Sequence, residues 1–321
     1  MIRSLLPTPL GVRLFPVHGR EIARASAPRP PIRLAHLTDL HFCAGALPRY
    51  PASHDVLRRT VAALNAQDLD AVVVTGDLFD FPDRLHEDGP ALAALMRDLR
   101  HPWYVAVGNH DVEGRRVAAR RRYLAETLGD HGLARAEESF YHVPLGHGVH
   151  LVVLDTTDNG EADYLTWRGH VSARQLAWLD ATLGRLAGEM VIVGLHHPPV
   201  APYPLMDALK FHEPDKRRLA RVLAKHAHEP VMLCGHFHMA GCLPFGKAGV
   251  LAGPGLIEHP HQYRVFEIRP EQGLITFHLE EVPSAEGECE ACVRGPARFR
   301  SRLLRNLSHA RSGHLRVADA R

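Results

Sequence analysis

The chain has 321 residues, of which 45% are apolar and 23% charged, and its formal net charge is +2. This composition is typical of a globular protein and excludes collagen, a disulfide-stabilised miniprotein and a disordered chain. The sequence contains no apolar run of about 18 residues, the length that a membrane-spanning helix needs, so no such helix is expected.

Three segments are expected along the chain. Residues 1–28 form a leader, in which prolines and an arginine interrupt the apolar stretch that a signal peptide needs. Residues 29–285 form the catalytic domain, and residues 286–321 form an arginine-rich tail. The five cysteines indicate no disulfide framework, and we expect a cytoplasmic protein.

Short apolar runs alternate with amphipathic segments from residue 32 onward, a pattern that predicts βαβ units and a mostly parallel sheet. The predicted strands are 32–37, 71–74, 103–107, 150–154, 190–195 and 231–234. The predicted helices are 53–66, 89–99, 115–128, 172–186 and 215–226, the last beginning after Pro214. Further on, residues 250–251, 263–268 and 274–279 alternate like antiparallel strands.

Side chains that can bind a metal ion follow five of these strands. They are Asp39 and His41, Asp77, Asn109 with His110 and Asp111, His196 and His197, and His236 with His238. Because ligands collect at the carboxyl ends of strands in open α/β sheets, we expect these side chains to converge in one crevice. Glycines 76, 108 and 235 directly precede candidate ligands, where the chain must turn sharply.

The donor types indicate which ions the crevice holds. Carboxylate, carboxamide and imidazole without thiolate suit Mn, Fe or Zn. A mononuclear catalytic site typically uses about three protein groups, so the larger candidate set favours two divalent ions. Asp77, alone at its strand end, is the candidate for a ligand that bridges both ions. Such a pair activates a bridging hydroxide for attack on phosphorus.

The ordered motifs DxH, GDxxD, GNHD, HHPP and GHxH resemble those of the calcineurin-like metallophosphoesterase superfamily over residues 32–280. The resemblance implies an α/β fold, a four-layer α/β/β/α sandwich, with the metal site at the carboxyl ends of the strands. It also implies the ligands, which are Asp39, His41, Asp77 and His238 for one ion and Asp77, Asn109, His196 and His236 for the other. His110 would act as the general acid, with Asp111 or a neighbour orienting its ring.

Several polar residues near the motifs are expected to serve the structure. His197 is interpreted as a satisfied structural histidine, and Asp155 ends another strand without a nearby ligand partner. Asp80 stands one turn after a ligand, where it caps or orients it. Cys43 and Cys234 are expected in the core.

Within the superfamily, the sequences LDTTDNGE and RGHVSARQLAWLDATL resemble bacterial class III 3′,5′-cyclic nucleotide phosphodiesterases. The loop 201–215 is expected to form one wall of the pocket for a small phosphoester. In that loop, Pro202, Tyr203, Pro204 and Met206 are candidates for packing a base, and Lys210 or His212 for meeting phosphate. The predicted activity is therefore a phosphodiesterase that acts on cyclic nucleotides.

Two other functions stay open. Residues 294–321 hold eight arginines and one acid, with an apolar stripe of Phe299, Leu303 and Leu307. This tail suggests peripheral membrane contact, and with it a phosphodiesterase or pyrophosphohydrolase that acts on a lipid- or glycerol-linked substrate. The apolar stripe also fits a helix that packs on its own domain or in a homodimer. The other alternative is a catalytically silent scaffold. Nucleic acid is not an expected partner, since the rest of the chain has 30 basic and 35 acidic residues.

Overall fold

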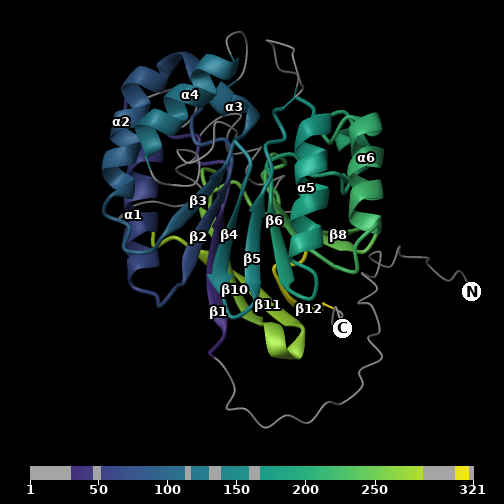
Figure 1. Cartoon of the computed structure of the whole chain (residues 1–321). Helices are drawn as coiled ribbons and strands as arrows, with labels where there is room; N and C mark the ends of the chain where they lie inside the picture. Colours follow the sequence, from purple (N-terminus) through teal and green to yellow (C-terminus); the bar gives the residue numbers. More distant parts are fainter. Residues whose placement is uncertain are drawn as a thin grey trace, which may run out of the picture.

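The computed structural model describes residues 30–45, 52–112, 117–129, 139–158, 167–284 and 308–317. Two six-stranded sheets lie against each other in the middle of the molecule, and helices cover their outer faces (Figure 1). The first sheet is covered by α1 (Ser53–Asn65), α2 (Leu85–Met96) and α4 (Val117–Leu128). The second sheet is covered by α5 (Ala173–Arg185) and α6 (Glu213–Ala224). The predicted four-layer α/β/β/α sandwich is confirmed.

The first sheet has the strand order β12-β11-β10-β1-β2-β3. Its bounds are β1 (Ile32–Leu37), β2 (Ala71–Thr75), β3 (Trp103–Ala106), β10 (Gln262–Arg269), β11 (Leu274–Glu281) and β12 (Ser312–Arg316). Strands β1, β2 and β3 run parallel, whereas β10, β11 and β12 add in antiparallel fashion. The three parallel strands therefore end at one edge of this sheet.

The second sheet has the order β4-β5-β6-β7-β9-β8. Its bounds are β4 (Tyr141–Gly146), β5 (Val149–Val153), β6 (Met190–Gly194), β7 (Val231–Cys234), β8 (Gly241–Phe245) and β9 (Ala248–Ala252). Strands β5, β6, β7 and β9 are parallel, and β4 and β8 pair antiparallel at the two edges. The second sheet is thus a parallel core with antiparallel edges, whereas the first has its parallel strands on one side and its antiparallel strands on the other.

Alternate residues of the central strands enter two different apolar layers. In β1, Ala35 and Leu37 pack under the helices, whereas Leu34 faces the layer between the two sheets. In β2, Val72 packs under the helices and Val73 faces the layer between the two sheets. Because both faces of these strands are buried, apolar residues occupy both faces instead of alternating with polar ones, although β1 also contains Arg33 and His36.

The structure corrects several details of the predicted elements. The prediction of a mostly parallel sheet is wrong, because the two sheets contain equal numbers of parallel and antiparallel strand pairs. Edge strands β4 and β8 were not predicted, and β9 pairs parallel with β7 as well as antiparallel with β8. Helix α6 begins at Glu213 with Pro214 in its first turn, earlier than expected.

Residues 308–317 lie within the expected tail, and they join the two sheets. β12 pairs with β11 of the first sheet. Just before it, the His309 N–H donates to the carbonyl of Ala240, which precedes β8 of the second sheet. The fully buried guanidinium of Arg264 donates to the carbonyls of Ala310 and Ala252, at 2.8 and 3.0 Å.

The leader and the apolar stripe of the tail lie outside the described residues. No helix in the described part of the chain combines the length and the apolar character needed to cross a bilayer.

Candidate metal centre

The predicted ligands lie just beyond the carboxyl ends of parallel strands in both sheets. Asp39, Asp77 and Asn109 follow β1, β2 and β3 of the first sheet. His196 and His236 follow β6 and β7 of the second sheet. The two sets meet where the sheets face each other, because the N–H of His236 donates to both carboxylate oxygens of Asp39 at 3.1 Å.

The backbone is left-handed at five of the predicted ligands. The angle φ is 52° at Asp39, 40° at His41, 51° at Asp77, 70° at His236 and 55° at His238. This conformation costs roughly 1–2 kcal/mol for a residue with a Cβ atom, and such strained residues gather at functional sites. The strain is therefore concentrated on the side chains that the motifs single out.

The three glycines that precede ligands leave no space for a side chain. A Cβ atom on Gly76, whose φ is 86°, would lie 2.6 Å from Nδ1 of His196. One on Gly108 would lie 2.2 Å from the backbone nitrogen of Asp77, and one on Gly235 would lie 1.8 Å from the hydroxyl of Thr38. The sharp turns expected at these positions bring the loops of both sheets into direct contact.

One group of donors consists of Asp39, His41 and His238, all buried. Nε2 of His238 lies 3.3 Å from Oδ1 of Asp39 and 3.1 Å from Nε2 of His41. The opposite ring nitrogens face outer carboxylates: Nδ1 of His41 lies 3.1 Å from Asp80, and Nδ1 of His238 lies 3.1 Å from Glu258. A carboxylate on the far nitrogen is the usual arrangement of a metal-binding histidine.

This arrangement fits a cation between the two rings. Each Nδ1 donates its proton to a carboxylate, so a neutral His41 and a neutral His238 both have a lone pair on Nε2. The two Nε2 atoms are only 3.1 Å apart. A metal ion beside Asp39 would satisfy both lone pairs and the carboxylate.

A second group centres on Asp77. Its Oδ2 lies 3.3 Å from Nε2 of His196 and 3.8 Å from Nε2 of His41, so this carboxylate lies between the two groups. Nε2 of His196 also lies 3.1 Å from Oδ1 of Asn109. Nδ1 of His196 donates to the carbonyl of Thr75 at 2.8 Å, which again turns Nε2 inward. The position of Asp77 supports its predicted role as a bridging ligand.

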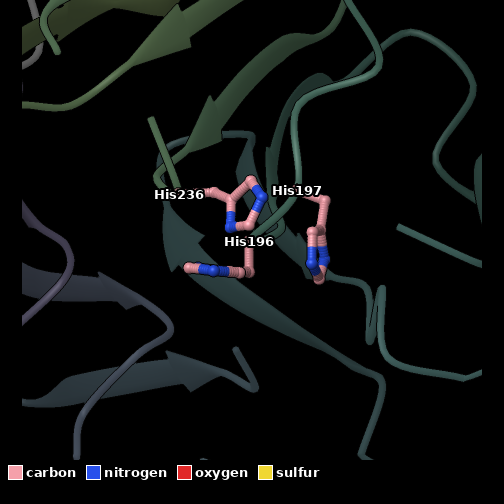
Figure 2. A group of neighbouring side chains, drawn as sticks. All are labelled: His196, His197 and His236. Carbon is pink, nitrogen blue, oxygen red and sulfur yellow. The ribbon is translucent and has the colours of Figure 1, made fainter. Parts of the chain in front are cut away.

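His196, His197 and His236 form a third group of neighbouring imidazoles (Figure 2). The ring centroids of His197 and His236 are 4.5 Å apart. Thr156 holds His197 through Nδ1 at 2.8 Å, whereas the buried Nε2 atoms of His197 and His236 have no hydrogen-bond partner in the described part of the chain. His197 was expected to be purely structural, yet the structure places it against a predicted ligand.

His110 lies beside the first group, with its ring centroid 4.9 Å from that of His41. Its Nδ1 donates to the carbonyl of Asp80 at 3.0 Å, and its backbone N–H donates to Oδ1 of Asp77 at 2.9 Å. The ring orientation is therefore set by a neighbour from the GDxxD motif.

Asp111 is fully buried and binds the backbone of the surrounding loops. Its carboxylate accepts N–H groups of Gly108, Leu78 and Phe79, at 2.8, 2.7 and 3.2 Å. These bonds fix the turn after β3 against the turn after β2. The catalytic role of Asp111 stays a prediction.

Burial and charge shift the pKa values of the centre in opposite directions. Burial alone would lower the pKa of His196, but the charge of Asp77 raises it to about 9. Burial alone would raise the pKa of Asp77, but the charge on His196 holds it well below its usual value. Burial lowers the pKa of His41 to about 4 and that of His236 to about 3, so both rings are neutral at pH 7. Neutral imidazole is the form that binds metals.

Sequence analysis missed Glu258, which follows β9 and carries no motif, so only the fold reveals its contact with His238. Two structural interpretations are confirmed: Asp155 bonds to its own loop at Thr157, and Cys43 and Cys234 are buried in the core. In the loop 201–215, Lys210 forms an ion pair with Asp207, with 3.1 Å between the charged atoms.

The chain is similar to several known proteins. A model of the calcineurin-like phosphoesterase family matches residues 32–240. A cAMP/cGMP dual specificity phosphodiesterase from Mycobacterium tuberculosis is 32% identical over 226 residues, and the alignment covers 67% of this chain and 64% of that protein. A probable glycerophosphodiester phosphodiesterase from Arcobacter nitrofigilis is 27% identical over 183 residues, covering 57% of this chain and 61% of that protein.

Among solved structures, a dimetal phosphatase from Danio rerio superposes with a TM-score of 0.62 at 18% identity, covering 80% of this chain and 98% of that one. The fold is therefore similar to that of this dimetal phosphatase, and buried Asp and His donors cluster within it. The chain belongs to the calcineurin-like phosphoesterase family.

Proposed function

We propose that the protein is a metal-dependent phosphodiesterase that hydrolyses 3′,5′-cyclic nucleotides. The observation that carries the proposal is the inward orientation of His41, His196 and His238, whose Nδ1 atoms are all held by oxygens outside the centre. The substrate class is supported by the similarity to the cyclic nucleotide phosphodiesterase from M. tuberculosis.

The donors divide into two sets that share one carboxylate. Asp39, His41, Asp77 and His238 would hold one divalent ion, and Asp77, Asn109, His196 and His236 the other. Manganese and iron suit this donor set best, and zinc also fits. Two such ions would supply positive charge for the phosphate and lower the pKa of a water molecule that attacks it.

His110 is proposed as the group that protonates the departing alkoxide. Because the carbonyl of Asp80 accepts the Nδ1 proton, the atom left to meet the substrate is Nε2. Protonated there, the ring would act as a general acid, which typically contributes about 10² to 10⁴ in rate. Asp111 would support this role by fixing the loop that carries His110.

A phosphodiester of glycerol is the alternative substrate class, favoured by the similarity to the A. nitrofigilis protein. A catalytically silent scaffold is disfavoured by the complete set of donors, since Asp39, Asp77, Asn109, His196 and His238 all meet in the structure. Membrane contact or homodimer formation by the arginine-rich tail stays a prediction.

The test is a panel of phosphoesters assayed after loading with Mn, Fe and Zn separately. We expect metal-dependent hydrolysis of cyclic AMP or cyclic GMP in preference to glycerophosphodiesters and UDP-linked sugars. Asp77→Asn is expected to lose bound metal, measured by elemental analysis, together with activity. Asp180→Asn, a matched change in an ion pair with Lys225 on the helical surface, should keep both.

Preference for a glycerophosphodiester would replace the proposed substrate and keep the enzyme class. Absence of turnover on every ester, including a nitrophenyl phosphodiester, by protein that holds its metals would support the scaffold and refute the proposal.

A further inference from the structure

A second cluster of metal-binding side chains lies outside the centre described above. It contains His170 in the segment before α5, His212 at the start of α6 and Asp215 in the first turn of α6. One donor atom from each residue lies within 4.8 Å of the other two. None of the three is a predicted ligand of the family centre.

The spacing of the donors resembles that of ligands around one tetrahedral ion. Oδ2 of Asp215 lies 3.0 Å from Nδ1 of His170 and 3.5 Å from Nδ1 of His212. Ligands about 2.0–2.1 Å from a tetrahedral zinc ion lie about 3.3 Å from each other. The two measured distances fall on either side of that value.

Hydrogen bonding explains only half of this arrangement. His170 is at hydrogen-bond distance from Asp215, but the separation of 3.5 Å to His212 is too long for a good bond. Nδ1 of His212 is a buried atom without a hydrogen-bond partner in the described ranges. A buried ring nitrogen 3.5 Å from a carboxylate oxygen that a second imidazole also approaches is compatible with coordination of one ion by all three side chains.

The charges are compatible with a cation. Arg218 pairs with Oδ1 of Asp215 and leaves Oδ2 for the two histidines. A carboxylate that binds a metal through one oxygen is commonly hydrogen-bonded through the other. Burial lowers the pKa of His170, which favours the neutral ring that coordinates a metal.

We infer that His170, His212 and Asp215 bind a divalent transition-metal ion of the zinc type, separate from the two ions of the family centre. Three protein ligands leave a fourth position for water. Carboxylate and imidazole are the donors that suit such an ion.

The ion would join two chain segments that line the centre. The His212 N–H already donates to the carbonyl of Gly169 at 2.7 Å, and the His170 N–H donates to the carbonyl of Thr156 at 2.8 Å. A Cβ atom on Gly169 would lie 2.6 Å from Cβ of His197. Coordination would therefore fix the segment 167–172 and the end of the loop 201–215 against His197.

The experiment measures zinc bound by the full-length protein after equilibration at micromolar zinc and removal of free ion. Unsubstituted protein is expected to retain one more zinc per chain than His212→Ala or His170→Ala. The control is His278→Ala, whose side chain is 53% exposed on β11, and it should match the unsubstituted protein. Circular dichroism verifies that each variant is folded.

A second measurement needs no variant. Crystals of zinc-loaded, unsubstituted protein should show an anomalous scattering peak at the zinc edge between the rings of His170 and His212. Equal zinc retention in all folded variants, or a map without this peak, would overturn the inference. Activity is not part of either measurement, so failure of the proposed cyclic nucleotide hydrolysis would leave this result unaffected.

Discussion

Glu258 offers a sharp test of the candidate centre, because its carboxylate lies against the outer ring nitrogen of a predicted ligand, His238. Its Oε1 lies 3.1 Å from Nδ1 of His238, and Glu258 and His238 are 7% and 6% exposed. Glu258→Gln keeps an oxygen that accepts the Nδ1 proton but removes the negative charge. Glu258→Ala removes the acceptor as well.

The two substitutions should weaken metal binding to different degrees. Loss of a residue that orients a metal-binding histidine typically costs about 10- to 100-fold in affinity. We expect about tenfold for Glu258→Gln, equivalent to about 1.4 kcal/mol, and about 100-fold for Glu258→Ala, equivalent to about 2.7 kcal/mol. The ion that His238 and His41 share should be affected, whereas the ion beside His196 should not.

Isothermal titration of metal-free protein with Mn²⁺ measures both affinities. Glu280→Gln is the matched control, since Glu280 binds the hydroxyl of Tyr263 at 2.9 Å on β11, away from the centre. If Glu258→Ala left both affinities within twofold of the unsubstituted protein, the assignment of His238 as a ligand held by Glu258 would be wrong.

Three further predictions concern acid catalysis, packing and pH. His110→Ala should slow the hydrolysis of alkyl phosphodiesters by about 10² to 10⁴ and that of nitrophenyl esters much less, because a good leaving group needs no proton. Equal losses of rate on both substrates in steady-state kinetics would contradict the acid role. Gly108→Ala should destabilise the protein by about 1–3 kcal/mol in urea unfolding, since its Cβ atom would lie 2.3 Å from Oδ1 of Asp77. A change below about 0.5 kcal/mol would refute the close packing. Burial, together with the charge of Arg264, lowers the pKa of His36 to about 3. Below about pH 6.5 the unfolded chain therefore binds a proton at His36, whereas the folded metal-free protein keeps this ring neutral. The contribution of neutral His36 to the free energy of unfolding is present above that pH and is lost as pH falls, by about 2 kcal/mol at pH 5. Urea unfolding at pH 7 and pH 5 should show a smaller loss of stability in His36→Gln than in the unsubstituted protein. An equal loss in both proteins would argue against this assignment.

The central strands were predictable because both of their faces are buried. The bounds of β1 and β7 match their apolar runs residue for residue, and the runs of β2 and β6 differ by one residue at the end. The two antiparallel edge strands of the second sheet lack this signal. β4 contains Pro144 and is partly exposed, and β8 contains Pro244, so neither has a long apolar or alternating pattern.

The candidate ligands were predictable because each stands at a fixed distance from a strand end within a motif. Their outer partners were not, since no spacing links Glu258 to His238 or Thr156 to His197. These pairs exist only because β5, β6, β7 and β9 lie side by side in one sheet. Asp80 is the exception, since its place in the GDxxD motif indicated an orienting role, which its contact with His41 supports.

The left-handed backbone at Asp39, His41, Asp77, His236 and His238 links ion capture to folding. The polypeptide adopts unfavourable torsion angles at these residues, and coordination of the proposed ions would compensate them. Chelating agents should therefore lower the thermal unfolding midpoint as well as abolish turnover. Glycine in place of His41 would relieve one torsion but remove a buried donor, so the stability that metal loading adds to the protein should fall.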